Sequence, residues 1–292
     1  MSFAIFTDTS ANLPTPMTKE LDITVVPLSY TVDGVEHVCL DTEEFQAAEY
    51  YESMKGNTVI KTSQVNPQKY LDYMESALKE GKDILFVGMS SGISGSFASA
   101  KIAREQLLEE YPDRSIRLVD SLGASLGEGL LALKGHACRE KGMSLDETAD
   151  YLEEAKANMY QLFTVDNLMH LRKGGRLSNA AAIVGSLLNI KPLLKGNENG
   201  QIVSFEKVRG RKAVINEIAK RYDQLVLEPQ DQIVGISHCH CPEDAEKLAD
   251  LIRQNRAPKE IIIVEHEPVT GSYLGPGALA LYFGGDKDVR LH

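Results

Sequence analysis

Apolar positions along this chain follow two repeating patterns. Short apolar runs, such as the one in Asp83–Gly88, predict strands that are buried on both faces of a parallel sheet. Longer stretches with apolar residues on one face predict helices, and Asn66-Pro67 provides a cap and a first-turn proline for a helix that runs to about Glu80. Strand, loop and helix repeat in this order, which predicts a parallel sheet with right-handed crossovers.

The same patterns predict the other elements of the first half. Strands are expected at 3–7, 23–27 and 115–119, a hairpin turn at Asp33-Gly34, and helices at 41–55, from Ser96 to about Tyr111 and from Ser144 to about Tyr160. We interpret this half, residues 1–160, as an α/β domain with a parallel, Rossmann-like sheet in three layers.

The order of elements changes after about residue 160. Strands are expected at 162–165, 201–208, 233–237, 260–264 and 278–283, helices at 168–189 with a break at Gly174-Gly175, at 212–227 and at 242–254, and a loop at 271–277. This pattern predicts a second α/β domain, residues 161–292, that is smaller and has a mixed sheet. Its segment 275–292 is free to pack back on the first domain.

Composition and charge limit the possible partners. Hydrophobic residues make up 43% of the chain and charged residues 25%, which excludes a disordered protein. Lys and Arg number 31 against 42 Asp and Glu, so the net charge is −11. A chain this acidic repels nucleic acid and anionic membranes as a whole, so any anionic ligand needs a local site.

The chain start and the cysteines indicate a compartment. The N-terminus, MSFAIFTD, has no basic segment of a signal peptide, and no apolar run approaches the ~20 residues that span a bilayer. The four cysteines, Cys39, Cys138, Cys239 and Cys241, suggest no disulfide framework at this length. We therefore expect a cytoplasmic protein without stable membrane insertion.

The loop Ser90–Ser96 is the first candidate for a ligand site. It follows a buried strand and precedes a helix, which is where ligands bind in open α/β sheets. Its small residues expose backbone N–H groups at the positive end of a helix, an arrangement that suits a phosphate or a carboxylate. The alternative is a tight strand-to-helix turn with a serine cap.

Three further polar segments are weaker candidates. The hydroxyls and amide of Lys61-Thr62-Ser63-Gln64 can form a hydrogen-bonding cup, or simply a capping loop. Basic residues gather in Arg172–Arg176 and again in Arg209–Lys212, where they can hold an anion or an acidic partner, or form solvated turns.

The segment His238-Cys239-His240-Cys241 resembles a metal site at first. On a strand, however, its histidines and cysteines point to opposite sides, and no second pair lies at zinc-finger spacing. We therefore expect no metal there.

Several short motifs occur together in one order along nearly the whole chain. They are Thr7-Asp8-Thr9-Ser10, Lys61-Thr62-Ser63-Gln64, Ser91-Gly92-Ile93-Ser94-Gly95-Ser96, Val119-Asp120-Ser121, Leu171-Arg172-Lys173-Gly174-Gly175-Arg176, Asn189-Ile190-Lys191-Pro192 and Gly275-Pro276-Gly277. This series resembles the DegV family of bacterial fatty-acid-binding proteins. The resemblance implies two α/β domains with a long-chain fatty acid bound between or beneath them.

The resemblance also implies roles for individual residues. The carboxyl group would be held by the hydroxyls of Thr62 and Ser94, with backbone groups near Gly95 assisting. In the fatty acid kinase system, family members present the acyl group to a separate ATP-using kinase subunit, which makes acyl phosphate. Arg176 and Arg209 are the basic residues that we expect to dock such a kinase.

One position departs from the family pattern. Where the family usually has histidine, two residues before Gly-Pro-Gly, this chain has Tyr273. A phenol can donate a hydrogen bond to a carboxyl group, but it cannot carry a positive charge.

We expect a fatty-acid-binding protein that is not itself a catalyst and needs no cofactor besides the bound fatty acid. Ala180–Leu188 and Leu193-Leu194 are candidates for the apolar lining, with core packing as the alternative. The alternative function is an acyl transferase or hydrolase with Ser94 as nucleophile, which would need His238, His240 or His266 as its base.

Overall fold

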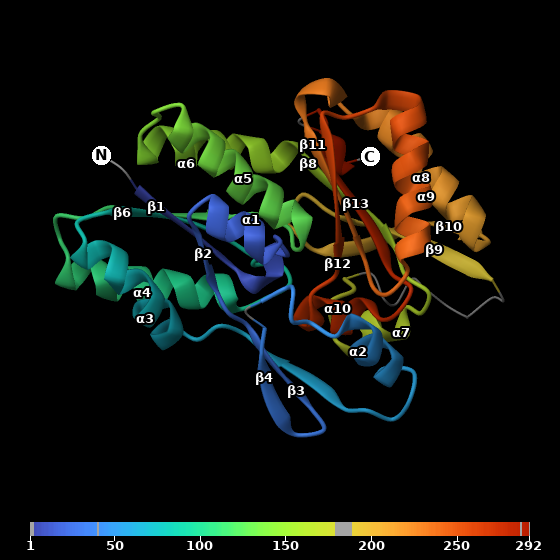
Figure 1. Ribbon diagram of the computed structural model, residues 1–292, viewed down its shortest axis with the longest axis horizontal. Helices are drawn as coiled ribbons and strands as arrows, with labels where there is room; N and C mark the ends of the chain where they lie inside the picture. The colour runs from blue at the N-terminus through green and yellow to red at the C-terminus, as the bar shows by residue number, and fades with distance from the viewer. Residues whose placement is uncertain (1–2, 40, 179–188, 287, 292) are drawn as a thin grey trace. The chain divides into compact units, whose positions relative to one another are not determined.

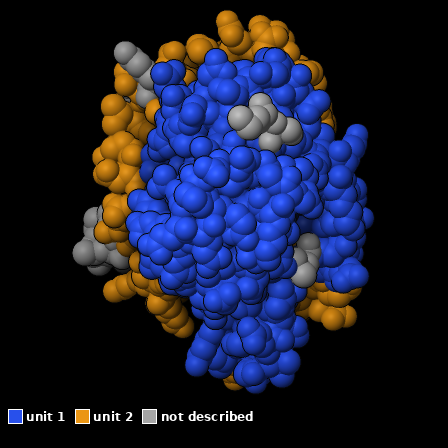
Figure 2. Space-filling view, turned by 90° about the vertical axis from the view of Figure 1, so that its left-hand side faces the viewer, with its two compact units in different colours: residues 1–45, 59–156 blue, residues 46–58, 157–292 orange. Residues whose placement is uncertain are grey.

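The chain divides into two compact units in the computed structural model, which describes residues 3–39, 41–178, 189–286 and 288–291 (Figure 2). Unit 1 consists of residues 1–45 and 59–156, and unit 2 of residues 46–58 and 157–292. The segment 46–58 therefore belongs to unit 2, although its neighbours in sequence on both sides lie in unit 1.

Unit 1 is built on a parallel sheet with the strand order β2-β1-β6-β7. The strands are β1 (Phe3–Asp8), β2 (Ile23–Val26), β6 (Asp83–Gly88) and β7 (Ile116–Asp120). Its helices are α1 (Thr15–Glu20), α3 (Pro67–Lys79), α4 (Ser96–Glu110), α5 (Leu126–Glu140) and α6 (Leu145–Asn158). Helices α3 and α4 lie on one side of the sheet and α5 and α6 on the other (Figure 1), which confirms the predicted three-layer parallel fold.

Local sequence signals account for the helix starts of unit 1. The side chain of Asn66 accepts a hydrogen bond of 2.9 Å from the amide of Lys69 and so caps α3. Ser144 and Glu147 form a reciprocal capping box at α6, with 2.8 Å from Ser144 N to Glu147 Oε2 and 3.3 Å from Glu147 N to Ser144 Oγ.

A small antiparallel sheet also belongs to unit 1. Its strands are β3 (Ser29–Val32), β4 (Val35–Val38) and β5 (Ile60–Ser63), in the order β4-β3-β5. Asp33 and Gly34 join β3 to β4 with φ values of 49° and 88°, as the predicted hairpin turn requires. Strand β5 is the element that carries Thr62.

Unit 2 is built on a six-stranded mixed sheet in the order β10-β9-β8-β13-β11-β12, within the described residues. The strands are β8 (Met159–Thr164), β9 (Ile190–Gly196), β10 (Ile202–Arg209), β11 (Ile233–His238), β12 (Glu260–Glu265) and β13 (Leu279–Gly284). The helices are α2 (Ala47–Ser53), α7 (Met169–Lys173), α8 (Arg211–Leu225), α9 (Pro242–Arg256) and α10 (Pro268–Leu274). The predicted mixed sheet of the second domain is confirmed.

The segment 275–292 contributes strand β13, which pairs with β8 and β11 inside the sheet of unit 2. Two predicted elements differ from the structure. Residues 41–46 form no helix, because Asp41 bonds the amide of Glu43 in a turn. The expected loop at 271–277 is partly helix α10, which Glu267 caps by accepting the amides of Val269 and Thr270.

The core of unit 2 lies where α8 and α9 cover the sheet. Phe283 packs edge-on against Tyr160 and Tyr222, with ring centroids 5.4 and 5.2 Å apart. In the described part of the chain, no helix has the length and apolar character that crossing a membrane requires.

Candidate ligand-binding site

The loop that follows β6 forms a compact turn in unit 1. The amides of Ile93 and Ser94 donate to the carbonyl of Ser90 at 3.2 and 3.1 Å, and the amide of Gly92 donates to the Ser90 hydroxyl at 3.1 Å. The loop lies at the carboxyl end of β6, immediately before α4. It therefore occupies the position predicted from the sequence, at the ligand-binding edge of a parallel sheet.

The hydroxyl of Ser94 is fixed at the start of α4. Its oxygen accepts a hydrogen bond of 3.1 Å from the amide of Ser96 and donates one of 3.0 Å to the Ser96 hydroxyl. Ser94 is half-buried. The hydroxyl thus has a defined direction, with acceptor capacity left for a ligand.

The segment that carries Thr62 lies beside this loop. The amide of Val65 donates to Ser96 Oγ at 3.2 Å, and Gln64 Nε2 donates to Ser99 Oγ at 3.4 Å. A Cβ atom at Gly95 would lie 2.0 Å from Gln64 Oε1, so the Gln64 side chain in its present position packs directly against Gly95. Unit 1 therefore places side by side the two hydroxyl-bearing segments that carry Thr62 and Ser94.

Two fully buried carboxyl groups lie at the carboxyl end of β1 and in α5. Asp8 accepts from the amides of Ser10 at 2.9 Å and Met89 at 3.4 Å, while Glu128 accepts from the hydroxyls of Thr7, at 2.9 Å, and Ser10. Burial raises the pKa of Asp8, and burial followed by the proximity of Asp8 raises the pKa of Glu128 well above its ordinary value. The hydrogen bond from the amide of Met89 places Asp8 at the start of the Met89–Gly95 loop.

No sequence motif assigns a role to either acid. Asp8 lies in Thr7-Asp8-Thr9-Ser10, and Glu128 lies in none of the motifs that carry the family resemblance. The only available signal was an acidic residue among small residues in the first turn of a helix that follows a small-residue loop.

Tyr273 lies on α10 in unit 2 and is half-buried. The guanidinium group of Arg176 stacks over its ring, 4.6 Å from the centroid, and donates to the carbonyl of Gly174 at 2.6 Å. A Cβ atom at Gly174 would lie 2.3 Å from the Tyr273 ring. The structure therefore joins Tyr273 to the Gly-Gly-Arg motif in one cluster, although the sequence suggested separate roles for Tyr273 and Arg176.

Arg209 stands apart in the chain, at the last position of β10, opposite Ile190 of β9. Its side chain is exposed, as a docking residue has to be. Arg176 is half-buried, and its guanidinium group is already stacked on Tyr273, so it is less available than Arg209 for contact with a partner.

A family model described as "Uncharacterised protein, DegV family" matches residues 2–284. The chain belongs to the DegV family. A DegV domain-containing protein of Clostridium perfringens is 40% identical over 97% of this chain and 98% of its own length.

Solved DegV structures have the same fold. A fatty acid binding DegV family protein of Streptococcus agalactiae is 30% identical with a TM-score of 0.85, over 98% of this chain and 99% of that one. DegV of Bacillus subtilis, described as a fatty acid binding protein, is 31% identical with a TM-score of 0.84, over 98% and 100%. A DegV family protein of Thermus thermophilus, with the description "fatty acid binding", is 27% identical with a TM-score of 0.88, over 98% and 100%.

The histidines and cysteines at the end of β11 are buried or hydrogen-bonded within unit 2 of this DegV chain. Cys239 is fully buried, and burial raises the pKa of its thiol well above the ordinary value. The Nδ1 atom of His238 accepts from the amide of Cys241 at 3.3 Å, and the amide of His240 donates to Glu265. Among the described residues, no three His, Cys, Asp or Glu side chains gather as ligands for a metal ion.

One of the three candidate bases for a Ser94 nucleophile, His266, has other partners. Both ring nitrogens of His266 are engaged within unit 2, Nδ1 with Ser237 Oγ at 2.9 Å and Nε2 with Thr270 Oγ1 at 2.8 Å. Burial lowers the pKa of His266 to about 3, so the ring is neutral. The hydroxyl of Ser94 is itself bonded to Ser96.

A nucleophile-elbow spacing that the sequence analysis overlooked occurs at Gly123-Ala124-Ser125-Leu126-Gly127, which reads G-x-S-x-G between β7 and α5. Ser125 has φ 53° and ψ −144°, the strained backbone typical of such a turn. Its hydroxyl is fully buried and has no hydrogen-bond partner in the described part of the chain. A nucleophile must reach its substrate, and this hydroxyl is closed off from solvent.

The predicted apolar lining is only partly described. Leu193 and Leu194 are fully buried on β9, and Leu193 belongs to the core that α8 covers. Ala180–Leu188 lies outside the described residues. Core packing therefore accounts for Leu193.

Proposed function

We propose that this protein binds a long-chain fatty acid and that Thr62, Ser94 and Gly95 hold its carboxyl group. The observation that carries the proposal is the contact between the segments of Thr62 and Ser94, through the close approach of Gln64 and Gly95. The three solved relatives that are described as fatty acid binding support the same ligand class.

The physical chemistry of the site agrees with a fatty acid. About 15 methylene groups at ~0.8 kcal/mol each give a gross ~12 kcal/mol of apolar burial, before the costs of binding. Affinity therefore comes mainly from the acyl chain, and the head group sets the orientation. Two neutral hydroxyls compensate the burial of an ionised carboxylate poorly, so they favour the protonated carboxylic acid.

We further propose that the protein presents the bound acid to a separate ATP-using kinase subunit in the cytoplasm. It catalyses no reaction itself and needs no cofactor for binding. Tyr273 donates a hydrogen bond to the head group, and Arg209 and Arg176 dock the kinase. The exposure of Arg209 on an acidic chain supports a docking role.

A lipid-binding titration of two loop variants tests the head-group assignment. We expect Thr62→Val and Ser94→Ala each to weaken fatty acid binding by about 0.5–1.5 kcal/mol, the net value of one hydrogen bond. Ser63→Ala and Ser91→Ala are matched controls, because both residues are exposed members of the same two segments. Wild-type affinity in both test variants would refute the assignment.

Native mass spectrometry of the purified protein distinguishes the carrier from the alternative hydrolase. A non-covalent fatty acid, released on denaturation, is the expected result. A fatty acyl ester that survives denaturation and maps to Ser94 would show that the protein is an acyl transferase or hydrolase.

A further inference from the structure

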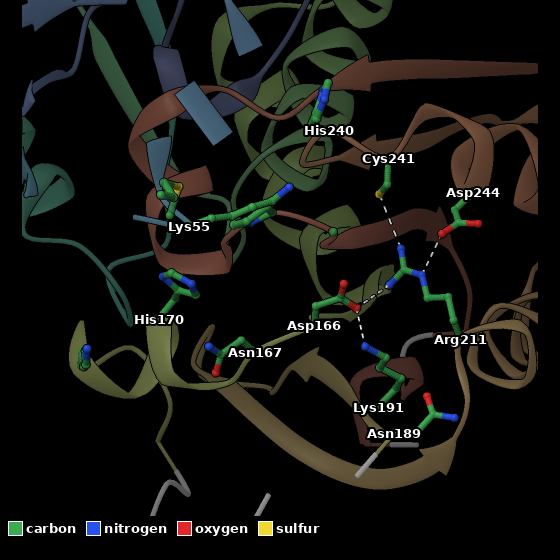
Figure 3. A pocket seen from close by; sticks show the side chains of 14 residues that line it. Lys55, Asp166, Asn167, His170, Asn189, Lys191, Arg211, His240, Cys241 and Asp244 are labelled. Carbon is green, nitrogen blue, oxygen red and sulfur yellow. Dashed lines mark hydrogen bonds and ion pairs between the residues drawn. The ribbon is translucent and has the colours of Figure 1, made fainter. Parts of the chain in front are cut away.

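Unit 2 contains a polar pocket that the proposed fatty acid site does not use. Its volume is about 740 Å³, within the usual range for small-molecule sites. Figure 3 shows Asp166, Lys191 and Arg211 at its centre, with His170 and Lys55 on the opposite side. Every residue that lines it belongs to unit 2.

The two carboxylates of this pocket are already neutralised by neighbouring cations. Asp166 lies 2.6 Å from Lys191 Nζ and 3.5 Å from Arg211 Nη1. Asp244 lies 2.8 Å from Arg211 Nε and 3.2 Å from Lys247 Nζ. These contacts hold Lys191 and Arg211 in place at the pocket wall (Figure 3).

Positive charge remains after these pairs are formed. Lys173 lines the pocket from the end of α7, and in the described part of the chain it makes no hydrogen bond or ion pair. His170 lies one helical turn earlier and also lines the pocket. In the described part of the chain, its ring makes no hydrogen bond either. Lys55 contributes a further ammonium group, which lies 2.6 Å from the exposed Glu52. The chain as a whole carries a net charge of −11, so this excess of cations creates a positive potential only locally, in the pocket.

The backbone adds to the positive potential of the pocket. Arg211 is the first residue of α8, and Cys241 immediately precedes α9, so both 15-residue helices begin at the pocket. Among the residues that the structure describes, no side chain caps either helix. The positive ends of two helix dipoles therefore point toward the same space as the lysines.

We propose that this pocket binds a phosphate group, either free or carried as a monoester on a small molecule. The cations approach from α7, β9 and α8, and a phosphate dianion presents three oxygens in different directions, whereas a carboxylate presents two. The volume leaves room for the rest of a small phosphomonoester. This site shares no residue with the head-group segments, so the proposal stands independently of the proposed function.

Isothermal titration calorimetry with three probes tests the site. Glucose 6-phosphate and inorganic phosphate should bind, whereas glucose should not. The phosphate that binds more tightly shows whether the site prefers a phosphomonoester or free phosphate. Lys173→Gln should weaken phosphate binding by about tenfold, the effect of removing one charged contact. Lys212→Gln is the matched control, because it makes the same charge change on an exposed residue of α8 that does not line the pocket.

The imidazole of His170 reports on the location of the bound phosphate. In the unliganded protein, burial and then Lys173 lower the pKa of His170. A dianion beside the ring favours the imidazolium form, so phosphate should raise this pKa in an NMR titration of the ring protons. The proposal is overturned if neither phosphate binds, if glucose binds equally well, if Lys212→Gln weakens binding as much as Lys173→Gln, or if the His170 titration does not move.

Discussion

Gly95 shows how much a single residue contributes to the proposed head-group site. Its φ of −79° is ordinary, so glycine is not required by the backbone. A Cβ atom there would, however, lie 2.0 Å from the end of the Gln64 side chain in its present position. That side chain is flexible and can move away, but its bond to Ser99 would then be lost.

We therefore predict that Gly95→Ala weakens fatty acid binding several-fold and changes the free energy of unfolding by less than about 1 kcal/mol. A lipid titration and a urea denaturation measure the two quantities. Gly56→Ala is the control, since a Cβ there meets only Ser53 O at 3.5 Å. Unchanged lipid affinity in Gly95→Ala would show that the position of the Gln64 side chain does not affect the head-group site.

Glu265 is a residue whose environment makes stability depend on pH. Burial raises the pKa of its carboxyl group to about 7, and a hydrogen bond from the amide of His240 opposes this rise. The neighbouring His238, 3.4 Å away, does not compensate as a cation, because burial lowers its pKa to about 4. At intermediate pH the folded protein therefore holds a proton on Glu265 that the unfolded chain has lost.

This proton makes the Glu265 contribution to stability fall as pH rises from about 4.5 to about 7. The Glu265→Gln variant lacks this contribution, so its stability relative to wild type should increase across that window and level off above it. Urea denaturation at pH 5, 6, 7 and 8 provides the comparison. Glu260→Gln, an exposed position on the same strand, should run parallel to wild type. If the free energy of unfolding of Glu265→Gln changes with pH in the same way as that of the wild type, the prediction is wrong.

At the scale of elements, two capped helices differ in how close their starts lie to the head-group segments in the sequence. Helix α3 starts at Asn66, directly after the segment that carries Thr62, whereas α6 starts at Ser144, away in sequence from either head-group segment. Both caps rest on a side chain that bonds an amide three residues on. Their energetic contributions should be alike, and their functional effects should differ.

We predict that Asn66→Ala and Ser144→Ala each reduce the free energy of unfolding by about 1 kcal/mol. Only Asn66→Ala should also weaken fatty acid binding, because fraying of α3 loosens Gln64 and its neighbours. Thermal unfolding and the lipid titration, run on both variants, provide the test. Equal loss of affinity in both would mean that binding follows overall stability and not the position of α3.

At the scale of the whole molecule, net charge and local charge have opposite signs. The chain carries −11, yet Arg209 and the Gly-Gly-Arg motif present positive groups. Association with a partner through such groups depends on complementary local charge and weakens with salt.

We predict that Arg209→Glu leaves fatty acid binding unchanged and slows phosphorylation of the bound acid by a fatty acid kinase subunit, most strongly at low salt. Acyl phosphate formation at two ionic strengths measures the effect. Lys259→Glu makes the same charge change on another exposed residue and should have a smaller effect. If both variants slow the reaction equally, net charge and not a docking contact is responsible.

The sequence by itself determined the features that depend on near neighbours in the chain. The caps at Asn66 and Ser144, the Asp33-Gly34 turn and the buried run in β6 all follow from residues within a few positions of one another. The order of short motifs was enough to indicate the DegV family. Where a local signal was misread, as at Asp41 and in α10, a nearby side chain offered the backbone a competing hydrogen bond.

Only the tertiary structure decided which distant residues meet. It assigned 46–58 to unit 2, stacked Arg176 on Tyr273, and brought Glu128 to Thr7, which is 121 positions away in the chain. It also collected the cations of the polar pocket from several separate elements. The reason is physical: hydrophobic patterning specifies which face of an element is buried, whereas the partner of each polar side chain depends on strand order and helix packing, which no short segment encodes.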